Sequence, residues 1–138
     1  MNRNEDLYVT ESEKSVQDFV TDFSAIVKEN AFVVNNAETM DMQKTFREHG
    51  GTVPDEFDLH MMQVCKPTKA DGSLTANPER AILMPKFVMV FSGDGKTQIR
   101  YMSYSLKDIA ELVPGDAKFP ESVSQTFVKI RSMIDEAK

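Results

Sequence analysis

The side chains best suited to chemistry gather in one short stretch, residues 57–67. This stretch contains the only cysteine of the chain, Cys65, one of its two histidines, His60, and the neighbouring methionines Met61 and Met62. A cysteine thiolate is both a nucleophile and a ligand for soft metals such as copper(I). A thiol-redox or soft-metal protein that uses Cys65, with His60 or a methionine of another strand, is therefore one hypothesis for the function.

The spacing within this stretch predicts a β-strand, and a strand separates the candidate ligands. Apolar and polar residues alternate at a period of two from Phe57 to Met61. Successive side chains of a strand point to opposite faces, so His60 and Met62 share one face while Cys65 lies on the other. We therefore expect no metal site from this strand. We also expect the Cys65 thiol to be buried by packing, as free cysteines usually are.

The same stretch is expected to run through the middle of a sheet. The alternation fails from Met62 to Val64, where both faces of the strand become apolar. A strand that is buried on both faces, or one that carries a bulge, has this pattern. We therefore predict a central strand over residues 56–66, ended by Pro67 because proline cannot donate to the ladder of hydrogen bonds.

A second set of candidate residues is basic. The chain has a formal net charge of −6, but the acidic excess lies in residues 1–60, whereas residues 61–100 are mildly basic. An acidic chain repels nucleic-acid phosphates, so we expect no nucleic-acid partner. The basic middle segment is either a solvated surface or a surface that faces a small anion or an acidic partner. Its candidate residues are Lys66, Lys69, Arg80, Lys86, Lys96 and Arg100.

Motifs of known catalytic machinery are absent from the sequence. It has no nucleophile-elbow serine, no metalloprotease histidine pair and no phosphate-binding glycine loop before a helix. We expect no metal and no cofactor. The sequence therefore favours a non-enzymatic protein that binds a small ligand or a protein partner, and an enzyme that acts on a small anionic substrate through the basic segment is an alternative. The residues selected as candidates for ligand binding are Cys65, His60, Met62, Lys86 and Arg100.

Hydrophobic periodicity predicts the elements that position these residues. Apolar residues recur at helical spacing from Val16 to Val27 and again from Val123 to Ile134, which indicates two long amphipathic helices. Thr10 or Ser12 could cap the first helix, and Ser122 the second. The other predicted elements are strands over 7–10 and 31–36, a short helix over 41–49, a loop over 67–78 with a helical turn at 77–80, a hairpin of 86–91 and 96–102, and a short helix over 106–113.

This order of elements predicts an α+β fold with a curved, mainly antiparallel sheet, because strands and helices stop alternating after residue 56. Both long helices are expected on one face, in the order strand-helix-strand-helix-strand-hairpin-helix. Every residue from Phe87 to Phe91 is apolar, so the second face of the sheet must also be covered. A homodimer formed across that face is one solution, and a cover made by the short helix or by residues 67–84 is another.

Length and composition set the remaining limits. With 138 residues the chain is expected to form one domain, residues 1–138. A single cysteine permits no internal disulfide. The N-terminus is polar and lacks the apolar segment of a signal peptide, and no apolar run approaches the ~20 residues of a membrane helix. We therefore expect a cytoplasmic protein with no membrane partner.

The order and spacing of these motifs resemble the family catalogued as domain of unknown function 302. The residues that carry the resemblance are Met62-Gln63-Val64-Cys65-Lys66-Pro67 followed by Ala70, then Ile82-Leu83-Met84-Pro85 and the hairpin. The resemblance covers nearly the whole chain. It implies a small α+β protein with a TATA-binding-protein-like arrangement of a curved antiparallel sheet and two helices, often paired as a dimer. It implies no activity, because the family has none that is established.

The chain departs from the family pattern in three places. Lys66 stands where members usually have asparagine, and Lys86 stands where they often have a second cysteine. Residues 67–80 are helical in typical members, but here they contain Asp71-Gly72-Ser73. The resemblance therefore implies no function that needs two thiols in this chain.

Overall fold

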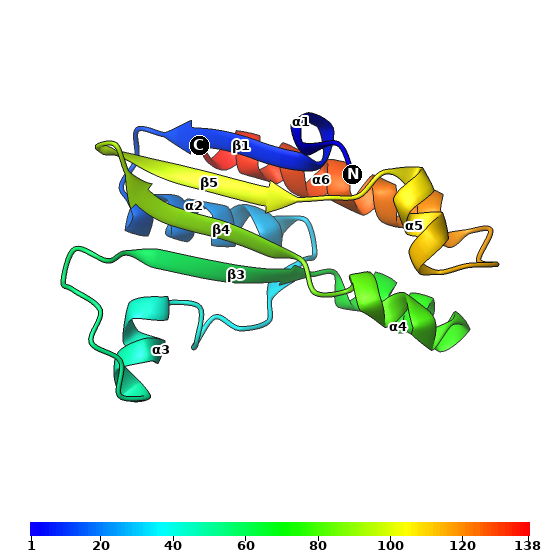
Figure 1. The fold of residues 1–138 in the computed structure, drawn as a ribbon, viewed down its shortest axis with the longest axis horizontal. Coiled ribbons are helices and arrows are strands. Elements are labelled where there is room, and N and C mark those ends of the chain that lie inside the picture. Colours follow the sequence, from blue (N-terminus) through cyan, green and yellow to red (C-terminus); the bar gives the residue numbers. More distant parts are fainter.

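A five-stranded antiparallel sheet organises the molecule, with its strands in the order β1-β5-β4-β3-β2 (Figure 1). The computed structural model describes residues 1–138. The strands are β1 (Leu7–Ser12), β2 (Val33–Val34), β3 (Leu59–Cys65), β4 (Phe87–Gly93) and β5 (Lys96–Met102). The helices are α1 (Arg3–Asp6), α2 (Val16–Glu29), α3 (Met42–Glu48), α4 (Pro67–Ala76), the 3-10 helix η1 (Pro78–Leu83), α5 (Leu106–Leu112) and α6 (Phe119–Ala137). The predicted α+β class is confirmed.

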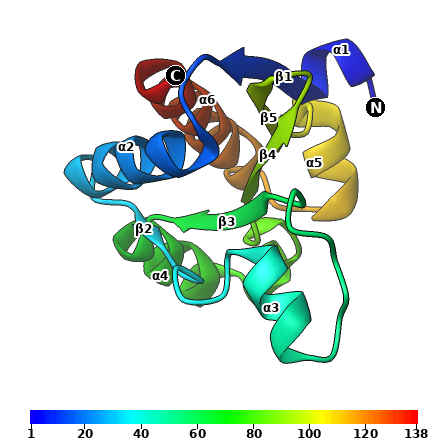
Figure 2. The same ribbon diagram turned by 90° about the vertical axis from the view of Figure 1, so that its left-hand side faces the viewer.

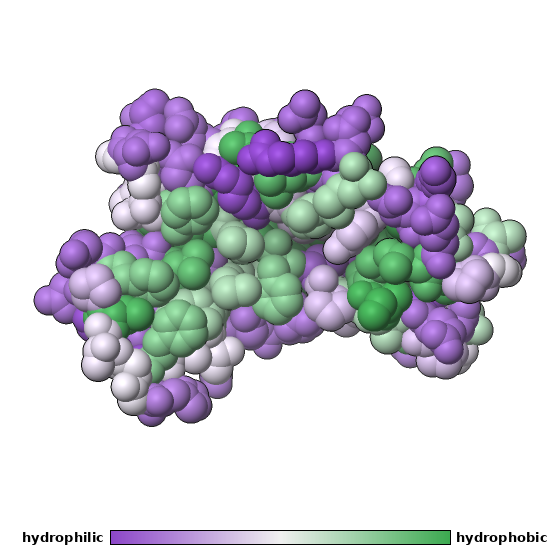
Figure 3. All heavy atoms as spheres, viewed as in Figure 1, coloured by the Kyte–Doolittle hydropathy of each residue, from purple (hydrophilic) through white to green (hydrophobic).

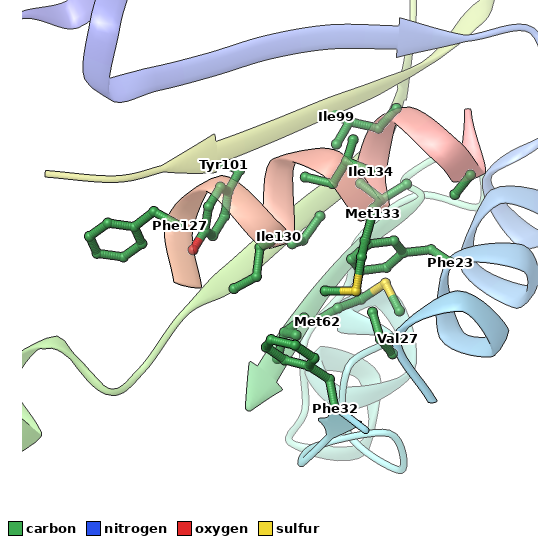
Figure 4. Close-up of a cluster of buried hydrophobic side chains, with 14 of the residues drawn as sticks. Phe23, Val27, Phe32, Met62, Ile99, Tyr101, Phe127, Ile130, Met133 and Ile134 are labelled. Carbon is green, nitrogen blue, oxygen red and sulfur yellow. The ribbon is translucent and has the colours of Figure 1, made fainter. Parts of the chain in front are cut away.

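The two long helices, α2 and α6, lie side by side on one face of the sheet (Figures 1 and 2). Their apolar stripes meet the sheet in the main hydrophobic core. In Figure 4, Phe23 of α2 and Met133 of α6 lie next to Met62 of β3. No helix in the structure is both long and apolar enough to cross a membrane.

The cap predicted for the first long helix is wrong. Thr10 and Ser12 belong to β1, where they pair with β5. The helix begins later, because Ser15 has extended backbone geometry and its hydroxyl accepts a hydrogen bond from the Asp18 N–H at 3.0 Å.

The second long helix also starts at another residue than predicted. It begins at Phe119, with Pro120 in the first turn, where a missing N–H costs least. The carboxylate of Asp116 accepts the Phe119 N–H at 3.1 Å, so Ser122 lies inside the helix and does not cap it.

Residues 67–76 form helix α4, so the predicted loop is wrong. Pro67 occupies the first turn, where its fixed φ favours a helix, and Lys69 is hydrogen-bonded to α6. These two effects outweigh the helix-weakening Gly72, because tertiary contacts routinely override intrinsic propensity. The turn predicted at 77–80 is present as the start of η1.

Strand β3 alternates without a break, so the predicted double burial at Met62 to Val64 is wrong. Met62 and Val64 are fully buried against the helices, whereas Gln63 between them is only partly buried on the opposite face. The pairing with β4 runs without a bulge. The outer neighbour β2 has two residues, far fewer than the predicted 31–36, so β3 lies near the sheet edge.

The predicted hairpin is confirmed as β4 and β5. Its outward side chains, with those of β1 and β3, form the surface that we call the open face. Hydrophobic side chains gather over this surface in Figure 3. Val9 is 45% exposed, Met89 37% and Met102 40%. On this side of the sheet α3 lies beside β3 (Figure 2), and Ile82 and Leu83 border a hollow together with Met89 and Met102, so the open face is covered in part.

The short helices α3 and α5 agree with the prediction, whereas α1 had no counterpart in it. Asp41 caps α3, and its carboxylate accepts the N–H of Gln43 at 3.1 Å. Helix α5 ends before Pro114, as its sequence indicated.

Candidate functional site

Lys86 is a charged residue on the helix-covered side of the sheet, where the neighbouring side chains are apolar. Alternation puts it on the same side as Val88 and Val90, which are fully buried against the helices. Lys86 itself is only 8% exposed. Its backbone carbonyl accepts the Val64 N–H at 2.8 Å, which fixes the residue beside the end of β3.

The ammonium group of Lys86 has almost no partner. Its Nζ donates one long hydrogen bond, 3.4 Å, to the carbonyl oxygen of Met84. It belongs to none of the ion pairs in the molecule. An ammonium offers three donors, and a buried charge without partners is strongly unfavourable. The site therefore lacks the negative charge that such a cation requires.

Two more lysines, both on or beside α4, flank this group. Lys69 Nζ donates to the Ser122 carbonyl oxygen at 2.7 Å and to the Thr126 hydroxyl at 2.8 Å, which leaves one donor free. Lys66 lies over the ring of Phe32, with its Nζ 5.8 Å from the ring centre. Neither lysine forms an ion pair.

These three lysines and Cys65 line one cavity between the end of β3, α4 and α6, which we call the lysine pocket. The cavity leaves about 30 Å³ for the centres of water-sized molecules, within a hollow whose total empty space, open solvent included, is about 390 Å³. The remaining lining residues are Val64, Ala70, Ser73, Met84, Phe119, Ser122, Val123 and Thr126. The pocket therefore combines positive charge with an apolar wall, and its free space suits a small ligand.

The pocket also alters the protonation of its lysines. Burial lowers the pKa of Lys86 to about 8, Cys65 acts in the opposite direction, and the nearby charge of Lys69 lowers this pKa further. Burial, and to a smaller extent the charge of Lys66, lowers the pKa of Lys69. Lys69 thus lies close enough to repel both Lys86 and Lys66, and an anion beside it reduces that repulsion.

The expectation of a buried thiol is wrong. Cys65 is partly exposed, because it lies at the end of β3 where the pocket opens. Cys65 therefore borders the same cavity as Lys86.

Three other candidates lie elsewhere. His60 and Met62 are buried on the helix side of β3, and Met62 belongs to the core in Figure 4. The His60 Nδ1 atom has no hydrogen-bond partner, and the Asp58 carboxylate is 3.6 Å away. Arg100 lies on the open face, over the ring of Phe91 at 5.3 Å. The structure therefore joins only Cys65 and Lys86 of the predicted set.

The other basic candidates are used elsewhere. Arg80 forms a buried ion pair with Asp116 at 2.6 Å, and Lys96 pairs with Glu11 and Glu13 at the surface. No group of three or more His, Cys, Asp or Glu side chains is placed to hold a metal ion.

Sequence reasoning missed the four pocket residues of α6 as site residues, namely Phe119, Ser122, Val123 and Thr126. No local pattern marks them, because they reach the site only through the packing of α4 on α6. The burial of Lys86 could have been predicted, because strand alternation places its side chain on the same face as that of Val88.

Comparison with known proteins agrees with this architecture. The family model described as "Domain of unknown function DUF302" matches residues 8–137. The chain belongs to the DUF302 family. A crystal structure of an uncharacterised conserved DUF302 protein from Bacillus stearothermophilus superposes with a TM-score of 0.76 at 16% identity, and the match covers 96% of this chain and 98% of that one. No curated protein matches the sequence significantly.

Proposed function

We propose that this DUF302 protein binds a small organic anion in the lysine pocket, and that it does so as a binding protein in the cytoplasm. The observation that supports the proposal is the buried, unpaired ammonium of Lys86 beside Lys69. A lone cysteine that forms no disulfide is consistent with a reducing compartment.

Physical chemistry favours a carboxylate with a small apolar part as the ligand. The anion supplies the charge that Lys86 and Lys69 lack, and charge-assisted hydrogen bonds are stronger than neutral ones. The apolar wall formed by Val64, Phe119 and Val123 favours a ligand with one or two carbon atoms beyond the carboxylate.

Titration of ¹⁵N-labelled protein with acetate, lactate, phosphate and sulfate, followed by NMR, tests this proposal. We expect saturable shifts of backbone signals in α4 and at the end of β3 with the carboxylates. The Lys86→Met variant should lose these shifts, whereas Lys129→Met, which removes an exposed lysine of α6, should keep them. Shifts that never saturate, or that persist in Lys86→Met, contradict the proposal.

We further propose that the protein forms a homodimer through the open face. The exposed Val9, Met89 and Met102 support this, because contiguous exposed apolar side chains usually mark an interface. Arg100 lies between Val9 and Met89 in the sheet, with its guanidinium over the Phe91 ring, and donates to the Thr10 carbonyl oxygen at 3.2 Å.

Light scattering after size-exclusion chromatography tests the dimer. The wild type should have twice the chain mass, and Met89→Glu at the centre of the face should be monomeric. Val128 is 68% exposed on α6, away from the open face, so Val128→Glu is the matched control and should remain dimeric. A monomeric wild type at high micromolar concentration rejects the proposal.

We also infer that the sheet and its two long helices have the TATA-binding-protein-like arrangement that the family resemblance implies. One antiparallel sheet with α2 and α6 on a single face supports this inference. Superposition on a TATA-binding protein structure tests it, and a different strand order there would contradict it.

A further inference from the structure

The lysine pocket brings a primary amine, Lys86, and a candidate anion-binding group, Lys69, into one partly open cavity. Lys86 is held beside the end of β3 by the hydrogen bond that its carbonyl oxygen accepts from the Val64 N–H, and Lys69 is anchored to α6 through Ser122 and Thr126. A ligand whose carboxylate meets the free donor of Lys69 therefore brings its next carbon atom towards Lys86. Such an arrangement converts a bimolecular encounter into an intramolecular one.

We propose that Lys86 reacts reversibly with the carbonyl carbon of a small 2-oxo acid to form an imine. This inference rests on the proposed anion-binding function, because the same pocket must hold the carboxylate. In a 2-oxo acid the carbonyl is bonded directly to the carboxylate, so the reacting carbon lies next to the anionic group, which suits a small pocket where both lysines line one space.

The reaction balances without any further reagent. The lone pair of the neutral Lys86 amine forms a bond to the carbonyl carbon, and the π electrons move to the carbonyl oxygen, which takes a proton from nitrogen. The resulting carbinolamine then loses its hydroxyl group and the second nitrogen-bound proton as one water molecule. The products are the imine and water, and the reverse reaction is hydrolysis.

Two features of the pocket favour this chemistry at Lys86 over the surface lysines. Only the neutral amine is a nucleophile, and a lysine becomes reactive when it is desolvated or lies beside another cation. With a pKa of about 8, Lys86 is neutral at pH 7 on the order of a hundredfold more often than an ordinary lysine. Burial also restricts the water that hydrolyses an imine.

Reductive trapping tests the proposal directly. The full chain is incubated with pyruvate and sodium cyanoborohydride, which reduces an imine but not the ketone, and the modified peptide is mapped by mass spectrometry. We expect one adduct, on Lys86, formed at least tenfold faster than any adduct on the exposed Lys107 or Lys129 of the same chain. The Lys86→Arg variant, which keeps the charge, should lose this adduct.

The competitor lactate separates this proposal from the one on which it rests. Lactate has the carboxylate but no carbonyl, so it should bind the pocket and slow the trapping by pyruvate. If lactate shifts the NMR signals of α4 but pyruvate modifies only exposed lysines, the imine is rejected and the anion site stands. If neither compound affects the pocket, both proposals are rejected.

The pH dependence of trapping provides a readout that a structural role of Lys86 would not change. At pyruvate concentrations well below saturation, where the rate reflects the free protein, the rate at Lys86 relative to the rates at Lys107 and Lys129 should be highest below about pH 8 and should fall towards pH 10. The ratio is used because the reductant itself slows at high pH at all three positions. Equal profiles at all three positions contradict the proposal.

Discussion

Two cations close to Phe119 are held in opposite ways. Arg80 lies over the Phe119 ring at 5.2 Å and forms an ion pair with Asp116 whose side chains are only 13% and 6% exposed. Lys86 lines the lysine pocket with the same phenylalanine but has no acidic partner. Arg80 therefore joins η1 to the start of α6, whereas the fold leaves Lys86 available to a ligand.

The partners of Arg80 show what a structural cation requires. Asp116 accepts from both the Nε and the Nη2 atoms of Arg80, at 2.6 and 2.9 Å, and from the Asn77 amide at 3.0 Å. The hydrogen bond from Arg80 is the main cause that holds the pKa of Asp116 far below its usual range. Nothing comparable surrounds Lys86, so its burial opposes folding.

The largest effect is expected from breaking the structural pair. Asp116→Asn leaves Arg80 without its counter-charge, and the melting temperature should fall by roughly 15 °C in calorimetry. The control is Asp55→Asn, because Asp55 pairs with Arg47 at 2.8 Å but is 97% exposed. That variant should change the melting temperature by less than about 2 °C. Equal losses in the two variants would show that Arg80 is not held by the buried pair.

At the lysine pocket, removal of the cation is expected to stabilise the protein. Lys86→Met removes a buried charge and keeps the length of the side chain, so the free energy of unfolding at pH 7 should rise by about 2–3 kcal/mol. The stabilised variant should lose anion binding, as stabilising substitutions at functional sites often do. Lys129→Met should change neither quantity, and a destabilised Lys86→Met would contradict the comparison.

The difference in stability between Lys86→Met and the wild type should also depend on pH. The folded protein releases the Lys86 proton near pH 8, whereas the unfolded chain holds it up to the ordinary value of 10.5. Between these values the unfolded state binds more protons, so wild-type stability rises with pH. The advantage of Lys86→Met should therefore shrink from pH 8 to pH 10.5 in urea titrations. If Lys86→Met were more stable than the wild type by the same amount at every pH, the protonation of Lys86 would not be the cause of the difference.

The smallest expected effect concerns the thiol. Cys65 lines the pocket and is partly exposed, so the native protein should react with a thiol reagent without unfolding. A saturating carboxylate should slow this reaction several-fold by occupying the pocket. Lys86→Met should react at a rate that the carboxylate does not change. An inert thiol in the native wild type would mean that the pocket is closed.

Much of the fold could be predicted from local patterns, and the site only in part. The hairpin and the two long helices have strong periodic signals, so their existence followed from the sequence. Helix α4 was missed because Gly72 weakens it, while the hydrogen bonds of Lys69 to α6 come from a segment more than fifty residues away. Cys65 was placed in the core by the general tendency of cysteine, although the end of its strand opens into a pocket.

The protonation of Lys86 is the most direct test of the central claim, which is that this buried ammonium lacks a counter-charge until an anion binds. The chemical shift of its ¹³Cε atom, followed by NMR from pH 6 to pH 12 and assigned with Lys86→Arg, reports the pKa. We predict a midpoint near pH 8 in the free protein, and a clear upward shift when acetate is added. A midpoint near 10.5 that acetate leaves unchanged would contradict the account.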